Sequence, residues 1–306
     1  MGTHWYTHYL AAKKTVDDRA LNHGVIERLR AEIATRGASK LRVLEIGSGL
    51  GTMVARLVDW GVVTRADYHL LDVDADLLSY ARAWLLAWAQ SRGFEAQGDA
   101  AGLTVRGQPA VDLSVNFRDA EIGQFLEERS PEIARADLII ANALLDLVEV
   151  PFILPRLFEM VVPGGLFLFT INFDGETIFE PEHPDDAHFL RVYHRSMDRR
   201  VRYGRSAGES KTGRHLFSYL RDAGATILAV GASDHVVYGR DGRYPADEAA
   251  FLHQIVSFVD QELRKHDEIE ASALAEWVTL RREQIDKAEL VYIAHQLDFV
   301  GHTRPG

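Results

Sequence analysis

Strand and helix patterns alternate along the first half of the chain, and this alternation constrains the fold more than any other feature. Apolar runs typical of buried strands, at 41–46 and 67–73, are each followed by a segment with helical spacing, at 51–60 and 75–90. Alternation of this kind is typical of a parallel sheet covered by helices on both faces. We therefore predict an α/β fold, a three-layer sandwich around a mostly parallel sheet.

Later segments extend the same sheet. Strand patterns recur at 111–117, 136–142, 165–173, 225–232 and 289–301. These make about seven strands, and we expect the last one to run antiparallel. Helices are expected near 17–37, 120–129, 150–160 and 212–224, with two more inside 245–287. The glycine-rich segment 93–109 is typical of a loop or hairpin and is interpreted as an insertion.

The chain is expected to form a single domain over residues 1–306. Its predicted parts are an N-terminal helical cap (1–40), a cofactor-binding core (41–173), a substrate-site insertion (174–211) and a C-terminal half of the sheet (212–306) with a helical insertion (245–287). Residues 174–211 lack regular apolar spacing. Together with the residues before Asp17, they are expected to form a mobile gate over the substrate site.

Composition excludes several kinds of function. The chain is 47% hydrophobic and 26% charged, which is ordinary for a globular protein, and it has no cysteine for a disulfide, a thiolate metal site or a cysteine nucleophile. Its net charge of -11 would repel a polyanion, so no nucleic-acid partner is expected. Without an apolar stretch of membrane length or a signal-peptide core, a cytoplasmic location with no membrane partner is predicted.

A glycine-rich turn follows the first strand. Gly47, Gly49 and Gly51 lead directly into a helix, where a tight backbone and unpaired N–H groups can approach a ligand. A dinucleotide fingerprint would need a glycine at position 52, which is Thr52, so a nicotinamide-dependent oxidoreductase is the less favoured alternative. Asp72 ends the second strand, where its carboxylate can accept hydrogen bonds from ribose hydroxyls.

Five features in order carry a family resemblance: an acidic residue opening the glycine turn at 45–51, the acid that ends strand two, Asp119 after 115–118, the strand 137–142, and the run 161–169. Together they resemble the class I S-adenosylmethionine-dependent methyltransferases of the small-molecule type, over about 41–173. The resemblance implies a Rossmann-like methyltransferase fold with S-adenosylmethionine as cofactor. The residues it places around the methionine and ribose part are Glu45, Gly47, Ser48, Gly49 and Gly51.

The resemblance also assigns the other cofactor contacts. Asp72 would hold the ribose hydroxyls, with Val73 against the adenine ring. Asp119 would accept a hydrogen bond from the adenine amino group with Arg118 beside it, and Asn142 would lie near the methyl sulfonium. Asp99 is a rival to Asp119. Asp119 is preferred because it precedes Asp137 by 18 residues, a usual spacing between the third and fourth strands.

A small-molecule methyl acceptor is expected, because the motif NPPY is absent at residue 142 and the protein is acidic. Its identity, and the atom that is methylated, stay open. The basic residues between Arg191 and Arg214 can hold a carboxylate or phosphate of the substrate, or can pair with the acidic helices of 245–287. A protein that binds S-adenosylmethionine or S-adenosylhomocysteine without catalysis is an alternative function. The oligomeric state is not indicated.

Histidines are the candidate general bases for methyl transfer to oxygen. His194 is the first choice and His183 the second, because imidazole titrates near neutrality. His295 lies in the last strand, where a structural hydrogen bond is expected instead. The acids and histidines of 180–194 match no metal-site spacing, and no metal is predicted. Near the N-terminus, Tyr6, Tyr9, Lys13 and Lys14 are candidates for a lid over the cofactor.

Overall fold

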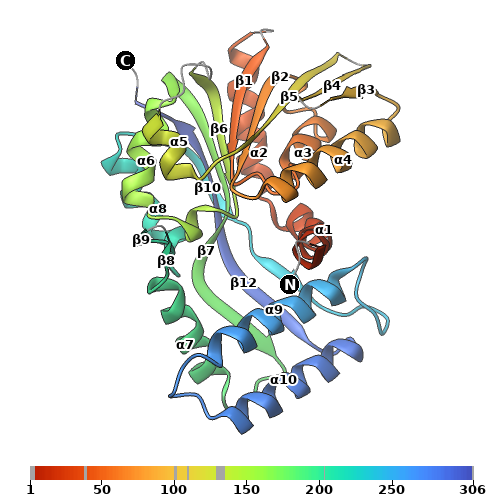
Figure 1. The fold of residues 1–306 in the computed structure, drawn as a ribbon, viewed down its shortest axis with the longest axis vertical. Helices are drawn as coiled ribbons and strands as arrows, with labels where there is room; N and C mark the ends of the chain where they lie inside the picture. The colour runs from red at the N-terminus through yellow and green to blue at the C-terminus, as the bar shows by residue number, and fades with distance from the viewer. Residues whose placement is uncertain are drawn as a thin grey trace.

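The computed structural model describes residues 4–37, 40–99, 102–108, 110–128, 135–202 and 204–304. Within these residues the chain forms a ten-stranded sheet (Figure 1). Its strands are β1 (Leu41–Ile46), β2 (Arg65–Asp72), β3 (Glu95–Gly98), β4 (Gly102–Gly107), β5 (Val111–Asp119), β6 (Ala136–Asn142), β7 (Val161–Glu180), β10 (Thr226–Ala232), β11 (His235–Val237) and β12 (Val291–His302). A separate pair joins β8 (Val201–Arg202) to β9 (Arg205–Ser206).

The strand order is β10-β12-β7-β6-β1-β2-β5-β4-β3, with β11 paired to β12. Neighbours from β5 to β7 are parallel, whereas β12 runs antiparallel to both β7 and β10. The predicted fold class, a mostly parallel α/β sandwich with an antiparallel last strand, is confirmed. The extra strands are the β3–β4 hairpin, which fills the predicted insertion, and the short β11.

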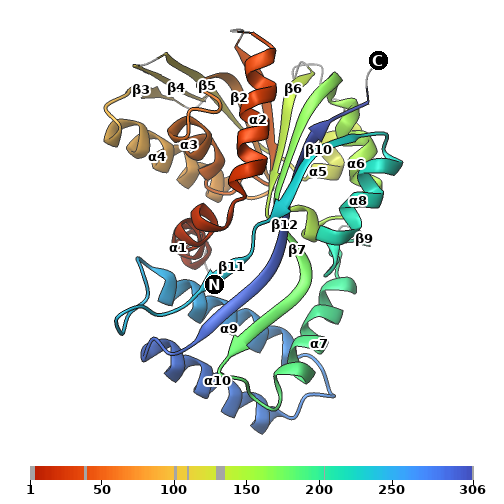
Figure 2. The same cartoon turned by 180° about the vertical axis from the view of Figure 1, so that it is seen from behind.

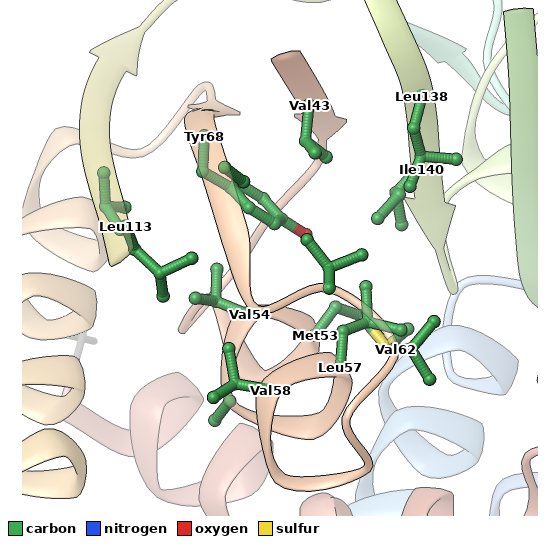
Figure 3. Close-up of a cluster of buried hydrophobic side chains, with 14 of the residues drawn as sticks. Val43, Met53, Val54, Leu57, Val58, Val62, Tyr68, Leu113, Leu138 and Ile140 are labelled. Carbon is green, nitrogen blue, oxygen red and sulfur yellow. The ribbon is translucent and has the colours of Figure 1, made fainter. Parts of the chain in front are cut away.

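Helices cover both faces of the sheet. They are α1 (His4–Ala20), α2 (His23–Thr35), α3 (Thr52–Asp59), α4 (Ala75–Ser91), α5 (Ile122–Glu128), the 3₁₀ helix η1 (Leu145–Leu147), α6 (Val150–Glu159), α7 (Asp186–Asp198), α8 (Thr212–Asp222), α9 (Glu248–Leu263) and α10 (Ala271–Asp286). One apolar core joins α2, α3 and α4 to the sheet, and another joins α5, α6 and α8 to its other face (Figure 2). In the first core, Tyr68 lies among side chains of β1, β5, β6 and α3 (Figure 3).

A third core lies beyond the end of the parallel strands. The strands β7 and β12 continue past their neighbours, and α7, α9 and α10 pack on this extension (Figure 1). We call this part the cap: residues 174–180 of β7, 291–295 of β12, β11, and the helices α7, α9 and α10. Trp277 of α10 is fully buried there against Phe179 and Phe189. The cap is therefore built on the same two strands as the main sheet.

Two sequence-based predictions were wrong. The irregular segment expected at 174–211 begins as a strand, because 177–180 pair with 291–294, and it continues as the helix α7. The single helix expected at 17–37 is two helices. They are separated at Asn22, whose side chain accepts a hydrogen bond from the Val25 N–H at 3.1 Å and so caps α2. Among the described residues, no helix has both the length and the apolar character that crossing a membrane requires.

Candidate functional site

A cavity of about 1330 Å³ lies at the carboxyl ends of β1, β2 and β6. The strand order reverses here, because β2 and β5 lie on one side of β1 while β6 and β7 lie on its other side, and open α/β sheets bind ligands at such a point. Residues of the cap and of α1 form the opposite wall. Because a drug-sized ligand needs about 300–1,000 Å³, this cavity has room for two small molecules side by side.

The glycine turn forms the floor of the cavity beside β1. Gly47, Gly49 and Gly51 have φ values of 60°, 54° and 67°, a left-handed conformation that glycine adopts without a steric penalty. A Cβ on Gly47 would lie 2.5 Å from Leu144 Cδ1. The turn is fixed to the next strand because the Gly49 N–H donates to Asp72 Oδ2 at 2.8 Å. Gly47 and Gly49 line the cavity, and Gly51 is the N-cap of α3.

Asp72 and Val73 line the cavity at the end of β2. The other oxygen of Asp72, Oδ1, accepts from the Asp74 N–H at 3.1 Å. Burial raises the pKa of Asp72, while these backbone N–H groups act against the rise. Each carboxylate oxygen retains a lone pair for a ligand hydroxyl. Val73 is 57% exposed, which is unusual for an apolar side chain at a strand end and suits a flat ring placed over it.

Ser48 carries an unsatisfied hydroxyl. The residue is 6% exposed and lines the cavity, yet its Oγ has no hydrogen-bond partner within the described part of the chain. Its backbone N–H is already used, because it donates to the Leu71 carbonyl at 3.1 Å. Buried hydroxyls usually find partners, so the free Oγ indicates that a ligand with a polar group belongs in the turn.

Glu45 is not among the described residues that line the cavity, contrary to the prediction. The side chain lies in the core, where the Tyr68 hydroxyl donates to Glu45 Oε2 at 2.7 Å. With the residue only 1% exposed, burial raises the pKa of Glu45 to about 8. Because β1 is buried on both faces, the Glu45 side chain lies in the core at the base of the glycine turn and not in the cavity.

The third parallel strand lies where it was predicted, and it ends at Asp119 opposite Asp72. Asp119 is exposed, and the residues that follow it, 120–124, line the cavity. Neither Asp119 nor Arg118 does so itself; Arg118 lies 5.1 Å from the Phe125 ring centroid. Asp99, the rival, accepts from the Gly102 N–H in the β3–β4 turn at the far edge of the sheet. The topology therefore favours Asp119 over Asp99.

Asn142 ends β6 and lines the cavity as its position in the sequence suggested. Its Oδ1 accepts a hydrogen bond from Thr170 Oγ1 at 2.9 Å. Because this bond fixes the oxygen toward β7, the Asn142 amide group is held in one orientation. Its NH₂ group remains as the polar group that a ligand can meet.

The two histidines predicted as bases are not among the described residues on the cavity wall. His194 lies behind Thr177, with Nε2 3.0 Å from Thr177 Oγ1 and its ring 5.2 Å from that of Phe173, and burial lowers the pKa of His194. His183 Nδ1 accepts from the Asp185 N–H in the turn before α7. Each ring is used in local packing, and the assignment of either histidine as a base stays a prediction. His295 makes the expected structural contact, at 3.1 Å from Asp234.

Three arginines of the predicted basic run, Arg200, Arg202 and Arg205, line the cavity. Others pair elsewhere: Arg195 with Glu268, inside 245–287, and Arg214 with Asp174. The two interpretations of the basic run therefore each hold for part of it. No group of three or more histidines and acids placed to hold a metal ion occurs in the described ranges.

Helix α1 closes the cavity on a third side through buried charges. Lys13 and Asp17 form an ion pair that lines the cavity, and Asp17 Oδ1 is also 2.9 Å from His235 Nε2 of β11. Arg56 of α3 binds Asp18 at 2.6 Å, and Lys14 binds the same carboxylate. Of the predicted lid, Tyr9 packs on Phe251 and Phe258 of α9 and lines the cavity. The Tyr6 side chain lies outside the described part.

Asp146 is a cavity residue that the sequence-based reasoning missed. It lies in η1, four residues after Asn142, and burial raises the pKa of Asp146 to about 6 while the charges of Lys13 and Arg200 act against the rise. Its Oδ1 is buried with no hydrogen-bond partner among the described residues. The available signal was a single acid within the apolar run 143–148.

Comparisons with known proteins return similar folds. No protein-family model and no curated protein matches the sequence. Among solved structures, the chain is similar to an S-adenosylmethionine-dependent methyltransferase from Methanosarcina mazei (TM-score 0.46, 11% identity, covering 90% of this chain and 98% of that one). It is also similar to a mycolic acid cyclopropane synthase complexed with SAH (0.45, 12%, 91% and 84%). A third is phosphoethanolamine N-methyltransferase 2 from Haemonchus contortus with S-adenosyl-L-methionine (0.39, 14%, 92% and 53%).

Proposed function

We propose that the protein binds S-adenosylmethionine at the glycine turn and transfers its methyl group to a small molecule held against the cap. The observation that supports this most strongly is the arrangement of Gly49, Ser48 and Asp72. The turn is bonded to the Asp72 carboxylate, and the buried hydroxyl of Ser48, a residue of the cavity wall, has no partner among the described residues. This set offers one carboxylate and one hydroxyl to a ligand rich in hydroxyl and amino groups.

The residues present fit such a ligand. Asp72 would accept from the ribose hydroxyls, Val73 would cover the adenine ring, and Asp119 with the backbone after it would meet the ring edge. Ser48, Gly47 and Gly49 would contact the amino-acid part, and Asn142 would face the reacting end. When bound, S-adenosylmethionine supplies an electrophilic methyl group. The protein contributes orientation and a water-excluding enclosure made by α1 and the cap.

An acceptor with an anionic group is part of the proposal. Arg200 and Arg202 line the cap half of the cavity. Arg205 also lines the cavity, lies 3.7 Å from the Phe152 ring centroid and pairs with Glu127. Guanidinium groups bind carboxylates and phosphates through paired hydrogen bonds. The apolar residues between them, including Met197 and Ile255, would pack on the body of the acceptor.

Calorimetry with S-adenosylhomocysteine and with NADH tests the proposed ligand. We expect S-adenosylhomocysteine to bind and NADH not to bind. Asp67→Ala is the matched control for Asp72→Ala, because Asp67 lies on the same strand but is bonded to Asn116 away from the cavity. This control variant should leave the affinity for S-adenosylhomocysteine unchanged. Tight NADH binding would contradict the proposal. Cofactor binding without S-adenosylhomocysteine ever being formed during incubation with metabolite mixtures would instead support the non-catalytic alternative.

A further inference from the structure

Asp146 is placed rigidly, but one of its carboxylate oxygens, Oδ1, has no hydrogen-bond partner among the described residues. The η1 turn around it is fixed by the Leu147 N–H, which donates to the Leu144 carbonyl at 2.8 Å, and by the Glu209 N–H, which donates to the Asp146 carbonyl at 3.3 Å. The backbone is thus held from two sides. A buried carboxylate oxygen with no donor is costly, since the group loses hydration without a replacement.

A second buried aspartate shows what a structural carboxylate looks like in this fold. Asp298 of β12 accepts from the Ile171 N–H at 2.7 Å and from the Asn22 N–H at 2.8 Å, one bond on each oxygen. Burial raises the pKa of both Asp298 and Asp146 to about 6. Asp298 joins three elements, whereas Asp146 Oδ1 has no hydrogen-bond partner among the described residues, and Asp146 is a residue of the cavity wall.

The surroundings of Asp146 indicate the chemistry of the missing donor. Asp146 follows the end of β6, where the proposed reacting end of the cofactor lies, and the charges of Lys13 and Arg200 favour its ionised form. The facing cap wall is largely aromatic, with Phe251, Phe258 and Tyr292. An unpaired carboxylate oxygen beside an apolar wall fits a molecule with an apolar body that presents an N–H or O–H group.

We propose that Asp146 is a catalytic residue: its carboxylate binds the N–H or O–H of the methyl acceptor and takes that proton during transfer. This inference rests on the proposed function. In the step, a lone pair of the acceptor nitrogen or oxygen forms the bond to the methyl carbon. The carbon–sulfur bond breaks with its electrons remaining on sulfur, and the acceptor proton passes to Asp146. The acceptor is thus an amine or an alcohol with an apolar body.

The first test needs no ligand. Thermal unfolding at pH 8 is compared for the wild type, Asp146→Asn, Asp146→Ala and Asp298→Asn. Both Asp146 variants should raise Tm by about 2 °C, because they remove an unpaired buried carboxylate. Asp298→Asn should lower Tm by about 4 °C or more, since an amide can accept only one of the two N–H bonds. A fall in Tm for both Asp146 variants comparable to that of Asp298→Asn would make Asp146 structural and overturn the proposal.

The second test uses three probes that share a benzoate ring and a chain length, so that each carries the anionic group of the proposed acceptor: 4-(2-aminoethyl)benzoate, 4-(2-hydroxyethyl)benzoate and 4-(cyanomethyl)benzoate, each with saturating S-adenosylhomocysteine. The amine or the alcohol should raise the Tm of the wild type by about 1–3 °C and that of Asp146→Asn by less than half as much. The nitrile, which has no N–H or O–H, should have the smallest effect on both proteins. Whichever of the other two binds better identifies nitrogen or oxygen as the methylated atom.

The outcomes separate this inference from the proposed function. If S-adenosylhomocysteine alone leaves the Tm unchanged, the proposed function fails first. If it binds but the nitrile matches the amine and the alcohol, or no probe changes the Tm, the role of Asp146 is overturned while cofactor binding stands. An equal response of Asp146→Asn and the wild type to the amine or the alcohol would overturn it as well.

Discussion

The two halves of the cavity are held together by different interactions. In the sheet half, the functional groups are bonded within one strand–helix–strand unit: Asp72 accepts from the N–H of Gly49, 23 residues before it, and from that of Asp74. In the cap half, contacts join more distant parts of the chain, as with Asp17 of α1 and His235 of β11, which are 218 residues apart. The sheet half can therefore form from one short stretch of chain, while the cap half exists only after the whole fold has formed.

Asp17→Asn is expected to have the largest effect, because it removes the negative charge that balances two buried cations, Lys13 and Arg56, and that lies beside His235, whose pKa burial lowers. Lys13 and Arg56 would remain, with less charge to balance them. We expect the free energy of unfolding to fall by about 3–5 kcal/mol in urea titrations at pH 7. Asp18→Asn is the matched control, since the Asp18 side chain is 33% exposed and its loss should cost about 1 kcal/mol. Equal losses in the free energy of unfolding for the two variants would show that the ion pairs of Asp17 are not what stabilises the cap half of the cavity.

The charged groups around Asp17 also determine the direction in which the stability of the protein changes with pH. Burial alone would raise the pKa of Asp17, but Lys13, His235 and Arg56 outweigh it and hold this pKa well below its usual range. Its stabilising contribution is therefore present above about pH 4 and is lost as the pH falls further. Asp17→Asn should accordingly flatten the acid side of the stability profile.

Glu45 in the sheet half predicts the opposite pH dependence. With its pKa raised to about 8 by burial, the folded protein keeps a proton that the unfolded chain releases above about pH 4.5. Stability should therefore fall as the pH rises from 5 to 8, by on the order of 3 kcal/mol more in the wild type than in Glu45→Gln. The glutamine keeps an acceptor for the Tyr68 hydroxyl. Parallel urea-unfolding profiles for the two proteins would show that Glu45 is ionised in the fold.

Asp72→Ala tests the sheet half of the cavity directly. We expect S-adenosylhomocysteine to bind more weakly by about 1–3 kcal/mol, because a charged acceptor is lost from the ribose site and the Gly49 N–H loses its partner. Isothermal titration calorimetry measures the change, and circular dichroism checks that the fold is retained. An unchanged affinity would remove Asp72 from the ribose role.

The smallest expected effect separates Asp119 from Asp99. Asp119→Ala should weaken binding of S-adenosylhomocysteine by about 1 kcal/mol, the usual loss for one hydrogen bond at an exposed edge. Asp99→Ala should leave the affinity as it is, because Asp99 lies in the outer β3–β4 turn. The reverse result would show that the proposal assigns the adenine to the wrong strand end.

The sequence predicts what is encoded over short distances. The glycine turn and the strand ends at Asp72 and Asn142 follow from spacing and apolar pattern, whereas the antiparallel last strand is part of the fold that the family resemblance implies. The β7 extension was missed because residues 174–180 contain charged side chains, and their pairing with β12 is a contact across more than one hundred residues. Helix α1 was missed because it buries charged pairs, so its apolar spacing is weak. Asp146 was missed because the absence of a hydrogen-bond donor for its Oδ1 is visible only in the tertiary structure.

The shared strands β7 and β12 have a consequence for how the protein is made. Leu297 of β12 pairs with Asn172 of β7, and the cap core contains residues from α1 to β12. During synthesis the sheet core up to β7 can begin to form, but the cap has no partner for its central strand until residues 291–302 have left the ribosome. Until then residues 174–180 form a strand edge with unpaired N–H and C=O groups, of the kind that aggregates or binds chaperones.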